Sequence, residues 1–335
     1  MRIFFKNFAI IFISLGLAGL PAEALYRAFK VNLYKRACSK PTTDGDIYML
    51  QPGQGFVYSL RPFLNRDHVR GRKETPWSFT TNSHGFRGPE IGRKQQGSER
   101  LLILGDSNTF GWAESYKKTF PYLLSKKTGT GALIEVINAG IPGYNTVQEF
   151  SLLREIHDKI LPDKVILVFS TNDAEPQHTV PSDPHEIYRF VPSWLWEDLK
   201  EAVNQNLLPG DPLPVYQYRH SADYLAQFEF NRHKREECRK AMDQMAAFCQ
   251  SRKIPFYVFI PPDFNETIDA SYRAASIHKQ VSEWGRDSGF KVTDLLPEFL
   301  GLQREDLRVA GDGHPNAKAH ELIANRIHEV LLADK

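Results

Sequence analysis

From Arg100 to the C-terminus, short apolar runs alternate with segments of helical periodicity. Five of the runs are predicted to be strands: Leu101–Leu104, Leu133–Ile137, Lys164–Phe169, Pro255–Ile260 and Phe290–Thr293. Helices are predicted near residues 117–127, 146–159, 232–252, 270–288 and 316–333. This alternation is typical of a parallel sheet joined by right-handed crossovers. The sequence therefore predicts an α/β fold, with three α/β/α layers around a five-stranded parallel sheet in flavodoxin-like order.

Polar residues and glycines follow three of these predicted strands and precede the last predicted helix. The four segments are Gly105–Asn108, Asn138–Gly140, Ser170–Asp173 and Gly311–Asn316. Open α/β sheets bind their ligands in the crevice beyond the carboxyl ends of the strands. We therefore expect these segments to meet at one site.

Three side chains in these segments form a candidate catalytic set. A serine hydroxyl such as that of Ser107 is a weak nucleophile at neutral pH and needs a neighbouring base. His314 can accept and return the proton, because imidazole has a pKa of about 6.5. Asp312 can accept the other ring N–H, which fixes the tautomer and stabilises the imidazolium. The predicted catalytic residues are Ser107, His314 and Asp312.

Acyl transfer also needs donors for the charge that develops on the carbonyl oxygen, each worth about 3 to 4 kcal/mol. The candidate oxyanion donors are the N–H groups of Ser107 and Gly140 and the side-chain amide of Asn172.

Every one of these residues also has a simpler structural explanation. Gly-Asp-Ser is a common turn, Asn172 suits a turn or a helix cap, and His314 is placed to cap the last helix. The joint occurrence of all of them, in order and at strand ends, favours catalysis.

The four segments resemble the blocks of the SGNH, or GDSL-type, serine hydrolases, a family named after its serine, glycine, asparagine and histidine. Ser107, Gly140, Asn172 and His314 match these blocks in type and order. The resemblance covers residues from about 99 to 333. It implies the SGNH hydrolase fold and an esterase that needs no cofactor.

The same resemblance has one extension and two departures. The stretch Thr81–Gly88 is similar to the lead-in of many membrane-anchored members. Ser170 stands where the third block usually has glycine, and Asp312 precedes His314 by two residues rather than the more common three. Related acetylesterases share the shorter spacing.

The N-terminal region, residues 1–36, is a candidate membrane anchor. Arg2 and Lys6 precede an uncharged stretch, Asn7–Ala22, that is rich in Phe, Ile and Leu. Its 16 residues are few for a full span, so a removed signal peptide and a secreted protein are the alternative. Helical character continues after this stretch, which favours an uncleaved signal-anchor. The catalytic domain is then expected outside the cytoplasm, in the periplasm or extracellular space.

The remainder of the chain divides into a lead-in and a catalytic domain. Residues 37–98 are predicted to be extended with short strands, because glycine, proline and polar residues punctuate them. Residues 99–335 form the predicted hydrolase domain, interrupted at 174–231 by a proline-rich insertion. An insertion of this length beside a site is either a lid or a surface-packed loop.

Composition and cysteine placement narrow the possible partners. The net charge of +2 offers no basic footprint of the kind that nucleic-acid binding needs. No metal-type Cys/His spacing occurs, so we expect no metal, and the acyl-transfer chemistry of Ser107 and His314 requires no cofactor. Four residues share one helical stripe and predict a buried core face without a disulfide: Cys238, Met242, Met245 and Cys249.

Together these features predict a serine esterase that acts on short-chain O-acyl esters of a cell-envelope glycan or lipid, by analogy with the family. The expected partners are this acylated substrate and, through the N-terminal helix, the membrane. Two alternatives stay open. A sugar hydroxyl could resolve the acyl-enzyme, which would make the protein an O-acyltransferase. The chain could also be an anchored glycan- or partner-binding module without turnover.

Overall fold

The computed structural model describes residues 47–50, 58–69, 77–127, 134–174, 228 and 232–334. The predicted anchor, residues 1–36, and nearly all of the predicted insertion, residues 174–231, lie outside these ranges. Among the described residues, no helix combines the length and apolar character needed to cross a bilayer. The anchor and the lid therefore stay predictions.

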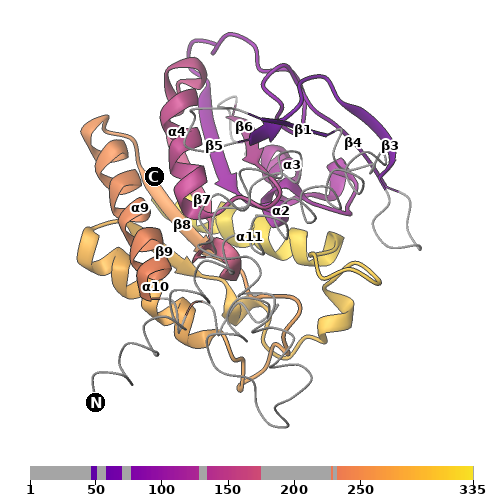
Figure 1. Cartoon of the computed structure of the whole chain (residues 1–335), viewed down its shortest axis with the longest axis vertical. Helices are drawn as coiled ribbons and strands as arrows, with labels where there is room; N and C mark the ends of the chain where they lie inside the picture. The colour runs from indigo at the N-terminus through magenta and orange to yellow at the C-terminus, as the bar shows by residue number, and fades with distance from the viewer. Residues whose placement is uncertain are drawn as a thin grey trace, which may run out of the picture. The chain divides into compact units, whose positions relative to one another are not determined.

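A five-stranded parallel sheet forms the centre of the fold, as predicted (Figure 1). Its strands are β5 (Glu99–Gly105), β6 (Ile134–Gly140), β7 (Lys164–Val168), β8 (Phe256–Ile260) and β9 (Lys291–Asp294). Their order across the sheet is β6-β5-β7-β8-β9, which is the predicted flavodoxin-like order. The register pairs Gly105 with both Gly140 and Val168. The segments that follow these strands therefore leave the sheet at the same edge.

Helices cover both faces of the sheet (Figure 1). On one face α3 (Phe120–Lys127) packs against α11 (Ala317–Ala333), and on the other α4 (Thr146–Ile160) and α10 (Ala275–Ser288) pack against α9 (Arg232–Ser251). The predicted stripe on α9 is confirmed, because Cys238, Met242, Met245 and Cys249 are all buried and both cysteines are free. Short 3-10 turns lie at η3 (Leu296–Glu298) and η4 (Arg304–Asp306).

Two predicted helix starts were wrong. The helix predicted from residue 117 is a 3-10 turn, η1 (Tyr116–Lys118), followed by an extended residue and then α3. Pro121 accounts for the break, because proline fits the first turn of a helix and not its interior. The helix predicted from residue 270 begins five residues later, because the Asp269 side chain accepts the Ser271 N–H in a turn.

The described part of the lead-in contains two short antiparallel pairs, in agreement with the predicted short strands. They are β1 (Tyr48–Leu50) with β2 (Tyr58–Leu60), and β3 (Asn65–Val69) with β4 (Trp77–Thr80). From Ile47 onward the lead-in belongs to the same compact unit as the central sheet. The Tyr58 hydroxyl, for example, donates to the Pro142 carbonyl at 2.9 Å.

Candidate active site

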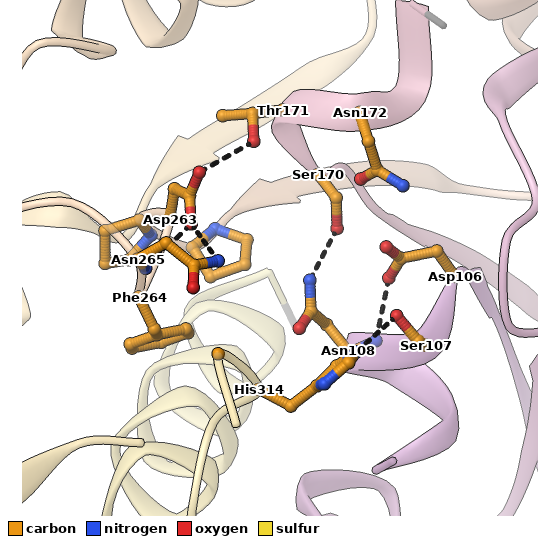
Figure 2. Close-up of a pocket in the computed structure, with 13 residues that line it drawn as sticks. Asp106, Ser107, Asn108, Ser170, Thr171, Asn172, Asp263, Phe264, Asn265 and His314 are labelled. Carbon is orange, nitrogen blue, oxygen red and sulfur yellow. Dashed lines mark hydrogen bonds between the residues drawn. The ribbon is translucent and has the colours of Figure 1, made fainter. Parts of the chain in front are cut away.

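Ser107 begins α2 (Ser107–Phe110), a single helical turn directly after β5. Gly105 has a φ of 153°, and a Cβ there would lie 2.1 Å from Thr109 Oγ1, so the turn requires glycine. Asp106 caps the turn, because its side chain accepts the Asn108 N–H at 2.8 Å. This local structure presents the Ser107 hydroxyl at the carboxyl edge of the sheet (Figure 2).

His314 lies on the loop that leads into α11. The backbone holds this loop, because the His314 carbonyl accepts the Val309 N–H at 2.9 Å. Asn316 then caps α11 with its side chain. From this position, His314 Nε2 lies 2.8 Å from Ser107 Oγ, although the two residues are 207 positions apart in the sequence (Figure 2).

Asp312 contacts the opposite side of the imidazole. Its Oδ1 hydrogen-bonds His314 Nδ1 and also accepts the His314 backbone N–H at 2.9 Å. Burial raises the pKa of Asp312, but the hydrogen bonds and charge of His314 outweigh burial, so the pKa lies below its ordinary value. An ionised Asp312 selects the tautomer with the proton on Nδ1, which leaves Nε2 to accept the Ser107 proton. The two-residue spacing is compatible with this arrangement, because the carboxylate folds back onto both N–H groups.

Asn172 lies on η2 (Thr171–Ala174), just beyond β7, and faces Asp106 (Figure 2). Asp106 is fully buried, and burial raises its pKa, while the hydrogen bond from the Asn108 N–H and the charge of His314 oppose the rise. An amide nitrogen carries two N–H donors. The Asn172 amide, which lines the same cavity as Ser107, can therefore donate to a ligand.

Gly140 is placed differently from the other predicted site residues. Its N–H donates to Asn138 Oδ1 at 3.0 Å, and it is not one of the residues that line the pocket. A Cβ at this position would lie 2.5 Å from Phe110 N, so close packing of β6 on α2 accounts for the glycine. Oxyanion binding by the Gly140 N–H stays a prediction, in which this N–H would turn toward the oxyanion or be shared with Asn138.

A cavity of about 190 Å³ opens beside Ser107 and His314. Its lining is mainly polar and consists of Asp106, Ser107, Asn108, Ser170, Thr171, Asn172, Pro261, Pro262, Asp263, Phe264, Asn265, Gly313 and His314. Ser170, at the position where glycine is usual, accepts the Asn108 side-chain N–H at 3.0 Å and joins two walls of the cavity.

Sequence reasoning missed the segment Pro261–Asn265. This segment follows β8 and reaches the cavity from the same edge of the sheet as the other site residues (Figure 2). The strand that precedes it was predicted, so the rule that ligands bind beyond strand ends would have located it.

His278 provides a second His–Asp pair for comparison. Its Nδ1 lies 2.7 Å from Asp294 Oδ1, but the ring is buried and its Nε2 has no hydrogen-bond partner among the described residues. Among the histidine side chains that the structure describes, His314 alone joins a serine hydroxyl to a carboxylate. The same described ranges contain no group of three or more His, Cys, Asp or Glu residues that could hold a metal ion.

Comparison with known proteins identifies a family and one curated relative. The sequence profile of the GDSL-like lipase/acylhydrolase family matches residues 103–322. An arylesterase from Vibrio mimicus is 35% identical over 80 residues, which make up 24% of this chain. The match spans 40% of the length of that relative.

Several solved structures are similar to this chain at low sequence identity. TesA has a TM-score of 0.45 and 13% identity, covering 70% of this chain and 98% of its own. The psychrotrophic esterase EstA from Pseudoalteromonas sp. has a TM-score of 0.44 and 15% identity, with the same two coverages, 70% and 98%. The acetyl xylan esterase AlAXEase has a TM-score of 0.43 and 16% identity, covering 69% of this chain and 98% of its own.

Proposed function

The chain belongs to the GDSL-like lipase/acylhydrolase family, and we propose that it is a serine esterase with Ser107 as its nucleophile. One observation carries this proposal: His314 lies within hydrogen-bond distance of Ser107 Oγ and is held on its other ring nitrogen by Asp312. This is the arrangement that general-base activation of a hydroxyl requires.

The proposed reaction has two acyl-transfer steps. His314 takes the Ser107 proton while Oγ attacks the ester carbonyl, and the resulting imidazolium is stabilised by ionised Asp312. The Ser107 N–H and the Asn172 amide stabilise the oxyanion. His314 then gives the proton to the leaving alcohol, which leaves an acyl-enzyme. In the second step His314 takes a proton from water while the water oxygen attacks the acyl carbonyl. His314 then returns this proton to Ser107 Oγ as the bond between Oγ and the acyl carbon breaks and the acid is released.

The proposal extends to the acyl group and the location of the enzyme. The small cavity favours a short acyl group. By analogy with exported members of the family, the acyl group is carried by a cell-envelope glycan or lipid. The apolar stretch Asn7–Ala22 supports a membrane anchor within residues 1–36, with catalysis outside the cytoplasm. We expect a reporter enzyme that works only outside the cytoplasm to be active when it is fused after about residue 40. A reporter that works only in the cytoplasm should be inactive at the same position. Activity confined to the cytoplasm would contradict this location.

A serine-reactive fluorophosphonate tests the assignment of the nucleophile. The probe should label the protein, and Ser107→Ala should abolish both the labelling and the hydrolysis of a short-chain aryl acetate. Ser115 is exposed, and its side chain makes no capping hydrogen bond. Ser115→Ala is therefore a matched control, which should keep both the labelling and the hydrolysis. Unchanged turnover in Ser107→Ala would remove the assignment.

A product assay separates hydrolysis from transfer. With an acylated donor and an excess of an acceptor sugar, an esterase releases free acid. Acyl-sugar as the main product would instead indicate an O-acyltransferase.

A further inference from the structure

We infer that the loop after β8 forms a hydroxyl-binding subsite, and that the esterified alcohol of the substrate is polyhydroxylated, as in a sugar. The subsite is formed by Asp263 and Asn265, with Thr171 and Asn108 on the adjoining walls of the same cavity. This inference rests on the proposed esterase function and specifies the chemical class of its substrate.

The loop lies beside the residue that handles the leaving alcohol. A Cβ placed on Gly313 would lie 2.1 Å from Asn265 Oδ1, so the Asn265 side chain packs directly against the backbone next to His314. In the proposed reaction His314 gives its proton to the alcohol oxygen. Groups next to His314 therefore face the alcohol part of the ester and not only its acyl part.

Asp263 supplies the acceptors for this subsite. Its Oδ1 accepts the Asn265 backbone N–H at 2.9 Å and the Asn265 side-chain N–H at 3.0 Å. Within the part of the chain that the structure describes, its Oδ2 accepts a single, long hydrogen bond of 3.4 Å from Thr171 Oγ1. A carboxylate has about four lone-pair sites, so Asp263 can accept further hydrogen bonds from hydroxyl groups. These internal bonds also hold the carboxylate in place on the cavity wall (Figure 2).

Desolvation explains why this wall selects hydroxylated alcohols. A bound alcohol displaces water from the half-buried Asp263 carboxylate and from Asn108 and Ser170. Sugar hydroxyls replace the lost hydrogen bonds, whereas an alkyl or aryl alcohol leaves the remaining donor and acceptor sites of these groups without partners. A site built to hydrogen-bond a hydroxyl discriminates strongly against analogues that lack it.

The test compares three acetate esters with the purified full chain. They are a mono-acetylated methyl glucoside, the same glucoside with every hydroxyl acetylated, and an aryl acetate. The first two share a ring and differ in their free hydroxyls. We expect the unmodified protein to have the highest kcat/KM on the mono-acetylated glucoside.

The measured quantity is the kcat/KM for the mono-acetylated glucoside divided by the kcat/KM for the aryl acetate. Asp263→Asn should lower this ratio by about tenfold to hundredfold, because a hydrogen bond to a charged group is lost. Asp269→Asn is the matched control. Asp269 lies in the same β8–α10 connection, is exposed, and accepts the Ser271 N–H at 2.7 Å in a similar turn. This control should keep the ratio of the unmodified protein.

The possible outcomes separate the subsite from the esterase function. An equal loss on all three esters, or an unchanged ratio, in Asp263→Asn overturns the subsite. A preference of the unmodified protein for the fully acetylated glucoside overturns it as well. In each of these cases fluorophosphonate labelling of Ser107 would persist. Absence of both labelling and turnover in the unmodified protein would overturn the esterase function itself, and the subsite with it.

Discussion

The two His–Asp pairs in this chain show how the setting of a residue decides its chemistry. His278 and Asp294 are 2.7 Å apart, and His278 lowers the pKa of Asp294 against the opposing effect of burial. His314 and Asp312 make the same kind of contact. Only the second pair opens onto the cavity and reaches a serine hydroxyl. The same residue types therefore stabilise the fold at one place and are poised for proton transfer at the other.

Asp312→Asn should lower kcat on an aryl acetate by about 10³- to 10⁴-fold, because the amide no longer selects the required tautomer or stabilises the imidazolium. Asp294→Asn is the matched control. It should lower the free energy of unfolding while the folded fraction keeps its kcat. Steady-state kinetics and thermal unfolding of both variants measure these effects. Equal kcat values for the two variants would contradict the role of Asp312.

At the scale of secondary structure, α3 and α11 are joined by a buried histidine that takes no part in the proposed reaction. His320 on α11 accepts the Phe120 N–H at 3.3 Å through Nδ1, and its ring stacks on the Phe120 ring. Its Nε2 is buried and has no hydrogen-bond partner in the described ranges. Burial, together with the charges of Arg87 and His314, lowers the pKa of His320 from 6.5 to about 3. The contact between the helices therefore requires a neutral ring.

This histidine should make stability depend on pH. Between pH 6.5 and about 3 the unfolded chain binds a proton at His320 that the folded chain does not bind. The free energy of unfolding should therefore fall as pH is lowered through this window, by up to about 1.4 kcal/mol per pH unit. His320→Gln should flatten this slope in urea titrations at pH 4 to 6, values that lie inside the window.

His328→Gln is the control for the pH series, because His328 lies on the same helix but is partly exposed. It should keep the slope of the unmodified protein. A slope unchanged in His320→Gln would show that other groups cause the acid sensitivity.

At the scale of the whole compact unit, the lead-in forms part of the catalytic structure. Arg87 is buried, and its guanidinium donates to the carbonyls of Phe110 and Glu114 at 3.0 and 2.6 Å. Burial lowers its pKa to about 10, so it still carries its charge at neutral pH. Trp77 of β4 packs edge-on against Trp112, at 4.9 Å between ring centroids. The lead-in thus supports the loop that follows α2.

Arg87→Met should lower the free energy of unfolding by about 2 to 4 kcal/mol, because buried carbonyl groups lose their donor. Arg61→Met is the matched control, since Arg61 belongs to the same lead-in but is exposed. Its effect should stay within about 0.5 kcal/mol. Urea unfolding of both variants measures the difference. Equal stability would show that the lead-in contributes little to the fold.

The sequence by itself determined the strands of the sheet and the place of Ser107 beyond the end of one of them. It could do so because uninterrupted apolar runs identify buried parallel strands, and because the residues after such strands meet at one edge. The helix starts near residues 117 and 270 were misjudged, because they depend on the first-turn preference of Pro121 and on a side-chain turn at Asp269.

Only the tertiary structure decided which groups near the site are free to act. It showed that the Gly140 N–H donates to the Asn138 side chain and that Pro261–Asn265 borders the cavity. It also showed that Arg87 supports the loop after α2. These facts depend on hydrogen bonds and contacts between side chains and backbone, many of them far apart in the chain. Periodicity reports which face of a strand or helix is buried, but it carries no information about which donor meets which acceptor.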